Sequence, residues 1–263
     1  MAVSCGLMSL GTARHCWSKA PEKMQASKVS QELRKLGNPQ MVLTQQWFFK
    51  TGPGEYGEGD EFLGLRVPQT RSVAKQFKAL PLEEIRKLAM GSFHEERFCA
   101  LAILVGRYKS ARSEEEKDQL FDFYLELLDA GKVNNWDLVD CSAPYLGAHL
   151  VGKEDVIAYL VALADTGDLW KQRVAIMFNY ALQRHYELEP TFAIVEHLMG
   201  HEHDLIHKAS GWMLREAGKK DLAALRRFLD AHAATMPRTM LRYAIEKMSR
   251  EERDHWLSQK SKL

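Results

Sequence analysis

Cysteine is scarce in this chain of 263 residues. Its four cysteines, Cys5, Cys16, Cys99 and Cys141, follow no CxxC pattern. Scattered thiols of this kind favour reduced cysteines, buried or at the surface, in a cytoplasmic protein. No apolar run reaches the 18 residues that a membrane span needs, so we expect no membrane partner. The first 20 residues also lack the basic and then apolar order of a signal peptide.

An excess of positive or negative charge is lacking as well, because the formal net charge is only +1. The balance therefore predicts no particular partner, although the two ends, residues 1–40 and 222–263, carry more lysine and arginine than acid. Basic ends are a weak indication of an anionic partner. We expect residues 1–24 to form a disordered tail and residues 25–263 to form a single domain.

Strands with period-two alternation are absent, whereas helical spacing occurs almost everywhere. Asn38 before Pro39 predicts a helix start. Ser92 with Glu95, and Ser113 with Glu116, match the capping-box pattern. Pro144 is expected to kink or end its helix. The predicted helices cover residues 29–36, 39–50, 68–80, 81–90, 93–110, 114–131, 134–150, 154–167, 168–185, 190–200, 204–218, 221–234 and 237–257.

About a dozen short helices with short connections cannot each bury an apolar stripe alone, but stacked antiparallel pairs can. Their lengths approach the ~40 residues of HEAT-type units. The predicted fold class is all-α, an α-solenoid of HEAT-like helix pairs whose concave face suits a long ligand.

Two motifs suggest ligands that we do not favour. The segment GPGEYG, Gly52–Gly57, matches a dinucleotide-binding pattern, but no strand precedes it and its acids would repel a pyrophosphate. We interpret it as a structured loop between helices. Histidines 197, 201, 203 and 207 include pairs at i,i+4, but Gly200 interrupts the helix and no H-E-x-x-H motif is formed. We expect solvated helix ends and no metal or other cofactor.

The segment NNWDLVDCSAP, 134–144, combines acids with an indole on a half-apolar helix. Trp136 and Asp140 lie four residues apart and share a helical face. Asp137 is near the helix start and suits capping or the helix dipole. Asp140 lies deeper, next to Val139, which argues against a solvated surface acid. The residues alone leave open whether Asp140 is structural or catalytic.

Two later segments place cations beside tryptophan. Arg173 follows Trp170 inside an otherwise apolar helix, and Lys208, Trp212 and Arg215 recur at one-turn spacing on one face. Core tryptophans with snorkelling cations are the simpler interpretation of each segment alone.

Together and in order, NNWDLVDCSAPYLG, LWKQRVAIMF and KASGWMLREAGKK resemble the AlkD-type bacterial DNA alkylation-repair glycosylases, and so does FFKTGPGEYGEGDEFLGLRVPQTR. The resemblance runs from about residue 25 to about residue 250. It implies a monomeric enzyme of the bacterial cytoplasm and nucleoid that removes cationic N3- and N7-alkylated purines from double-stranded DNA.

The resemblance also implies residue roles. Asp140 corresponds to the catalytic aspartate, and Trp136 and Trp212 to the aromatic residues beside the lesion. The implied DNA-binding residues are Arg173, Arg215, Lys208 and Phe48. Phe48 replaces a family tyrosine, which leaves the role of that hydroxyl unfilled.

These residue types suit the implied chemistry. An alkylated purine is already cationic and leaves without a general acid, so charge develops on an oxocarbenium-like sugar. A fixed carboxylate stabilises that charge, and indole faces favour a cation. A deep base-flipping pocket is not expected. A silent DNA-binding relative and a protein-binding scaffold remain alternatives. If the Asp140 side chain pointed away from the groove, or were locked to a neighbouring cation in the protein interior, the enzyme assignment would fail and the protein would be only a helical clamp.

Overall fold

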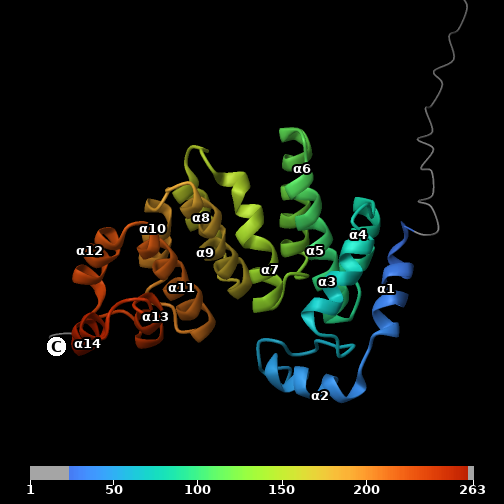
Figure 1. Ribbon diagram of the computed structural model, residues 1–263, viewed down its shortest axis with the longest axis horizontal. Coiled ribbons are helices and arrows are strands. Elements are labelled where there is room, and N and C mark those ends of the chain that lie inside the picture. Colours follow the sequence, from blue (N-terminus) through green and yellow to red (C-terminus); the bar gives the residue numbers. More distant parts are fainter. Residues whose placement is uncertain (1–23, 260–263) are drawn as a thin grey trace, which may run out of the picture.

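The fold is an α-solenoid, described by a computed structural model for residues 24–259, so the predicted tail lies almost entirely outside the described residues. Fourteen α-helices and no strand occur in this range, which confirms the all-α prediction. Figure 1 shows them following one another along the molecule's long axis. They are α1 Ala26–Lys35, α2 Pro39–Phe48, α3 Val67–Gln76, α4 Leu82–Ala89, α5 His94–Ser110, α6 Glu114–Asp129, α7 Trp136–Leu146, α8 Val156–Ala164, α9 Leu169–Arg184, α10 Glu189–His197, α11 Asp204–Lys220, α12 Leu222–His232, α13 Arg238–Ala244 and α14 Arg250–Ser258.

The helices form two layers. In one layer α5 packs on α7, α7 on α9, α9 on α11 and α11 on α13; α4, α6, α8, α10 and α12 cover it. One cluster of buried apolar side chains runs through both layers, from Ala26 to Trp256. Most helices thus bury an apolar stripe against neighbours, as short repeats must. Helix α2 is an exception, because none of its residues is buried.

Several helix starts follow the sequence signals. Asn38 accepts a hydrogen bond from Gln40 N at 3.0 Å, and Ser113 accepts one from Glu116 N at 3.2 Å. Asp168 accepts from the amides of Trp170 and Lys171 and starts α9. These side chains satisfy amides that have no partner inside the helix.

The capping box predicted at Ser92 and Glu95 is wrong. Helix α5 begins at His94 after Phe93, with no capping side chain. The Glu95 carboxylate instead accepts hydrogen bonds from three backbone amides in the loop between α2 and α3 at 2.9 to 3.0 Å, namely those of Leu63, Gly64 and Leu65. A buried backbone amide must find its acceptor within the protein, whereas amides at an exposed helix end can bond to water. Glu95 is only 3% exposed, and its carboxylate therefore serves the buried amides.

The helix predicted over 237–257 is in fact two, α13 and α14. Ser249 starts the second by accepting from Glu252 N at 3.2 Å. The proline predicted to end or kink a helix, Pro144, lies inside α7, which continues to Leu146 before a 3-10 turn at Gly147–Leu150.

The Gly-rich segment between α2 and α3 is an irregular loop, which confirms that prediction. Gly64 has φ +83°, and a Cβ there would lie 2.1 Å from the Asn38 carbonyl oxygen. Only glycine permits this approach of the loop to the start of α2. The loop end is thereby fixed beside α5 by Glu95 and beside α2 by Gly64.

Cys99 and Cys141 are buried free thiols, as predicted for reduced cysteines. Burial raises the pKa of Cys99 to about 12 and that of Cys141 well above its ordinary value. Among residues 24–259 no helix has the length and apolar character to cross a membrane.

Candidate active site

A cavity of about 510 Å³ collects most of the candidate residues. It receives side chains from both ends of the solenoid: α2 and its following loop on one side, α11 and α13 on the other, with α7 and α9 between. Aromatic residues and cations dominate, with one carboxylate. The lining residues are Trp47, Phe48, Lys50, Tyr56, Trp136, Asp140, Arg173, Leu205, Lys208, Trp212 and Tyr243.

Asp140 presents its carboxylate to this cavity while Arg173 holds it. Arg173 Nε donates to Oδ1 at 3.0 Å and Nη2 donates to Oδ2 at 2.8 Å. The third guanidinium nitrogen, Nη1, donates to the Leu205 carbonyl at 2.6 Å. Such a fork fixes both position and plane of a carboxylate. The Asp140 side chain stays 18% exposed, against 5% for Arg173.

Opposing effects act on the charge of Asp140. Burial raises the pKa of its carboxyl above the ordinary 3.8, and the nearby Asp137 adds to the rise. The charge and hydrogen bonds of Arg173 oppose it. Arg173 therefore supports the ionised carboxylate in a site that otherwise disfavours charge.

Trp136 is held by an aromatic stack that continues into the protein. Its ring stacks on Phe49 with centroids 5.5 Å apart, and Phe49 lies 4.8 Å from the His94 ring. Phe62 also lies 4.8 Å from the His94 ring and stacks on Phe49 at 5.2 Å, so these three rings contact one another. Three rings thus support one face of the indole that lines the cavity.

His94 of this aromatic stack is also part of a buried cluster of charged side chains. His94 Nε2 contacts Asp137 Oδ2 at 2.9 Å, and Nδ1 contacts Asp60 Oδ2 at 3.2 Å. Arg97 donates to Asp60 Oδ1 at 2.6 Å. Burial favours neutral His94, but the charge and hydrogen bond of Asp137 and the hydrogen bond of Asp60 prevail and raise the pKa of His94 to about 9. Asp137 lies in the first turn of α7, as the dipole role requires, and it also pairs with His94.

The predicted residues of α11 differ in their exposure to the cavity. Trp212 and Lys208 line it, whereas Arg215 does not. Both cations are paired with acids: Lys208 Nζ lies 2.6 Å from Asp204 Oδ2, and Arg215 bonds Glu246. Neither pairing tests the predicted DNA contact, but each must be exchanged for phosphate if the contact forms.

Phe48 lines the cavity at the end of α2 and is 52% exposed. Its ring meets that of Trp136 edge to face, with the centroids 5.7 Å apart. Sequence reasoning missed Trp47, Lys50, Tyr56 and Tyr243. Tyr56 enters from the Gly-rich loop; burial raises its pKa, while a hydrogen bond with Trp136 opposes the rise. Tyr56 thus places a hydroxyl near Trp136 in a site where Phe48 lacks one.

The histidines of the predicted cluster make separate contacts with different partners. His197 pairs with Asp165 at 2.7 Å, His203 accepts from Leu205 N, and His207 contacts the His201 carbonyl. No group of three or more metal-ligating side chains is arranged for a metal within residues 24–259.

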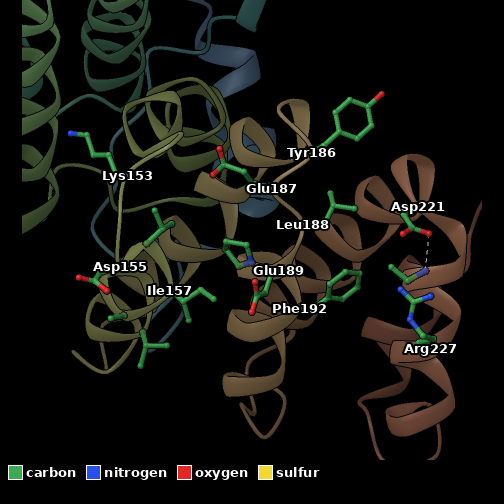
Figure 2. Close-up of a pocket in the computed structure, with 15 residues that line it drawn as sticks. Lys153, Asp155, Ile157, Tyr186, Glu187, Leu188, Glu189, Phe192, Asp221 and Arg227 are labelled. Atoms are coloured by element: carbon green, nitrogen blue, oxygen red, sulfur yellow. Dashed lines mark hydrogen bonds between the residues drawn. The ribbon is translucent and has the colours of Figure 1, made fainter.

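A larger cavity of about 1030 Å³ lies on the covering layer, between α8, α10 and α12. Figure 2 shows its lining, including Tyr186, Phe192 and Arg227, around the turn that precedes α10. None of the candidate residues lines it, so it plays no part in the site at Asp140.

These features define an all-helical repeat protein with an aromatic, cationic cavity around one partly buried carboxylate. The family model for "DNA alkylation repair enzyme" matches residues 29–248, so the chain belongs to the DNA alkylation repair enzyme family. A solved structure, "Predicted DNA alkylation repair enzyme from Enterococcus faecalis", is similar with a TM-score of 0.64 and 17% sequence identity; the match covers 81% of this chain and 97% of that one. At this identity the similarity shows the fold alone. No curated protein matches the chain.

Proposed function

We propose that this protein is a DNA glycosylase that hydrolyses the N-glycosidic bond of cationic N3- and N7-alkylated purines in duplex DNA. The supporting observation is the Asp140 carboxylate, oriented by Arg173 and open to an aromatic cavity. Family membership supports a repair enzyme, and this geometry favours the glycosylase chemistry. The protein would act as a monomer in the bacterial cytoplasm.

The reaction needs stabilisation of positive charge on the deoxyribose. As the bond to the cationic base breaks, the bonding electrons go to the base, which leaves neutral, and the sugar becomes oxocarbenium-like. A fixed Asp140 carboxylate stabilises that charge without reorganising and positions the attacking water. The water oxygen then bonds the sugar carbon and its proton is released to solvent.

The ion pair with Arg173 permits this role. Each carboxylate oxygen accepts one bond from the guanidinium and keeps a further lone pair. Because all three guanidinium nitrogens bond protein atoms and the side chain is 5% exposed, the geometry favours Arg173 as a positioning residue rather than a phosphate ligand. The phosphate contact of Arg173 stays a prediction.

The indoles suit the cationic base or sugar. Trp136 and Trp212 both line the cavity with Asp140. Cation–π contact contributes roughly 0.5–2 kcal/mol, depending on desolvation. The aromatic stack behind Trp136 keeps its ring in place for such contact.

Base release from methylated duplex DNA tests the proposal. We expect Asp140→Asn to bind DNA about as well as the parent and to lose release of 7-methylguanine, by roughly 10²-fold or more, the scale of one electrostatic group. Release is measured chromatographically under single-turnover conditions, with circular dichroism to verify folding. Asp165→Asn, which changes an exposed acid outside the cavity, is the matched control.

Undiminished release by Asp140→Asn would remove this residue from the mechanism. Absence of release by the parent protein, with DNA binding intact, would favour a non-catalytic DNA-binding relative, which the Asp140–Arg173 pair also suits. Absence of both would favour a protein-binding scaffold.

A further inference from the structure

The cavity around Asp140 contains one cation that no acid of the described chain neutralises. Three cations line the cavity, namely Lys50, Arg173 and Lys208. Arg173 holds Asp140, and Lys208 pairs with Asp204. Lys50 forms no ion pair with a carboxylate in the part of the chain that the structure describes. The cavity wall therefore carries an ammonium group that is available to an anionic ligand.

The end of α2 fixes the position of Lys50. Its Nζ lies 5.2 Å from the centroid of the Trp47 ring, which also lines the cavity. The two residues between them, Phe48 and Phe49, both contact the ring of Trp136, at centroid distances of 5.7 and 5.5 Å. An aromatic face attracts an ammonium group but supplies no negative charge. The rings thus hold Lys50 in the cavity beside Trp136 without neutralising it.

The backbone of Lys50 adopts a conformation that favours glycine. Its φ is +55°, in the left-handed region, directly after the last turn of α2, where helices commonly end on glycine. Two hydrogen bonds hold it: the Lys50 amide donates to the Trp47 carbonyl at 3.4 Å, and the Lys50 carbonyl accepts from Gly57 N at 3.0 Å. Strained backbone of this kind concentrates at functional sites. A lysine in a position that suits glycine points to a role for the side chain.

We propose that Lys50 binds a phosphate that flanks the lesion nucleotide. This inference rests on the proposed function. A deoxyribose at Asp140 carries a phosphodiester on each side, so anionic oxygens accompany the sugar into the same cavity. The compact ammonium charge suits phosphate. Without phosphate it would oppose the positive charge that develops on the sugar. Once phosphate neutralises Lys50, Asp140 stabilises that charge without this opposition.

The first test is the salt dependence of binding to a fluorescently labelled duplex of 25 base pairs. One phosphate contact contributes about 0.9 to the slope of log affinity against log salt. Lys50→Gln should therefore lower the slope by about 0.9 and weaken binding roughly fivefold near 0.15 M salt. Lys50→Arg, which keeps the charge, should retain the parental slope.

Lys50→Gly separates a ligand contact from a structural role. Glycine adopts the left-handed conformation without strain, so this variant should unfold at the parental temperature or higher, as measured by circular dichroism. It should nevertheless lose the same part of the salt slope as Lys50→Gln. A lower unfolding temperature with the parental slope would show that Lys50 only stabilises the end of α2, and would overturn the proposal.

A duplex with one 7-methylguanine and one neutral methylphosphonate locates the contact. The methylphosphonate replaces the phosphate on the 5′ or the 3′ side of the lesion. On one of the two sides it should raise the protein concentration that gives half-maximal single-turnover release by the parent. Lys50→Gln, which already lacks the contact, should respond by less than about twofold on that side. Equal responses of both proteins on both sides would refute the contact.

Lys220→Gln is the matched control. Lys220 Nζ lies 4.9 Å from the centroid of Tyr186 and also forms no ion pair among the described residues. Tyr186 lines the larger cavity of the covering layer (Figure 2). The substitution thus removes the same charge and the same kind of ring contact away from Asp140, and it should keep the parental slope and base release.

The outcomes separate this inference from the proposed function. If Lys50→Gln keeps the parental slope while the parent binds DNA and releases 7-methylguanine, the Lys50 contact is refuted and the proposed function stands. If the parent neither binds nor releases, both fail.

Discussion

At the scale of single residues, Asp140 depends on Arg173 for its charge. Without the guanidinium, burial and the charge of Asp137 would act on the carboxyl unopposed, and its pKa would rise further. If catalysis needs ionised Asp140, release of the base must fall as pH decreases through this pKa. The acid side of the pH profile therefore reports on the pair.

We expect Arg173→Gln to move the acid limb of single-turnover 7-methylguanine release to higher pH, since a buried carboxylate that loses its partner holds its proton more tightly. Arg173→Lys, which keeps the charge but not the fork, should shift the limb less. Spontaneous release from DNA without enzyme gives the background at each pH. An acid limb that stays at the parental pH in Arg173→Gln would show that Asp140 is not the titrating group.

Helical spacing correctly predicted that several residues of the site lie together. Trp136 and Asp140 share a face because they lie one turn apart, and the structure places both in the cavity with Trp212. The position of Tyr56 could not be predicted, because it depends on the path of an irregular loop. Gly64 and Glu95 fix that loop through contacts distant in sequence. Periodicity predicts helix faces and contains no information on such loops.

At the scale of elements, His94 links α5, α7 and the Gly-rich loop. It contacts Asp137 in α7 and Asp60 in the loop, and its buried ring packs against Phe49 and Phe62, which also contact each other. Because its pKa is about 9 in the folded protein and 6.5 ordinarily, folding favours the protonated form. Its stabilising effect is complete below about pH 6.5 and is lost as pH rises through about 9.

The free energy of unfolding should therefore fall between pH 6 and pH 9.5 by on the order of 3 kcal/mol more in the parent than in His94→Gln. Urea titrations at the two pH values measure both proteins, and the difference between them isolates His94 from other titrating groups. His94→Gln should also be less stable than the parent at pH 6. Equal pH dependence in both proteins would contradict a protonated His94.

Helix boundaries were the least predictable elements. The continuous helical pattern over 237–257 concealed the break between Ala244 and Arg250, because apolar residues recur on both sides of the break and are buried in both α13 and α14. Glu95 does not cap the start of α5 as predicted, because its carboxylate accepts three hydrogen bonds from buried loop amides instead. In both cases tertiary contacts, which the local sequence does not contain, decided the outcome.

At the scale of the whole molecule, the order of the helices and the all-α class were predictable because every repeat must bury one apolar stripe. The cavity was not, because it combines α2 and the Gly-rich loop with α11 and α13, elements far apart in the chain. The near-neutral net charge also conceals an uneven distribution: Asp140 is the cavity's single carboxylate among three cations. That arrangement suits phosphate around the site and positive charge at its centre.

This charge arrangement predicts selection by lesion charge. Two proton donors of the cavity are poor acids at neutral pH, because burial raises the pKa of Tyr56 and the Asp204 partner raises that of Lys208. A neutral base needs a proton in order to leave, and general acid catalysis is worth roughly 10²–10⁴-fold. Release of hypoxanthine from an otherwise identical duplex should therefore be slower than release of 7-methylguanine by at least roughly 10²-fold. Comparable rates would show that the cavity does supply a proton. The hypothesis that the charge of the lesion drives the reaction would then be wrong.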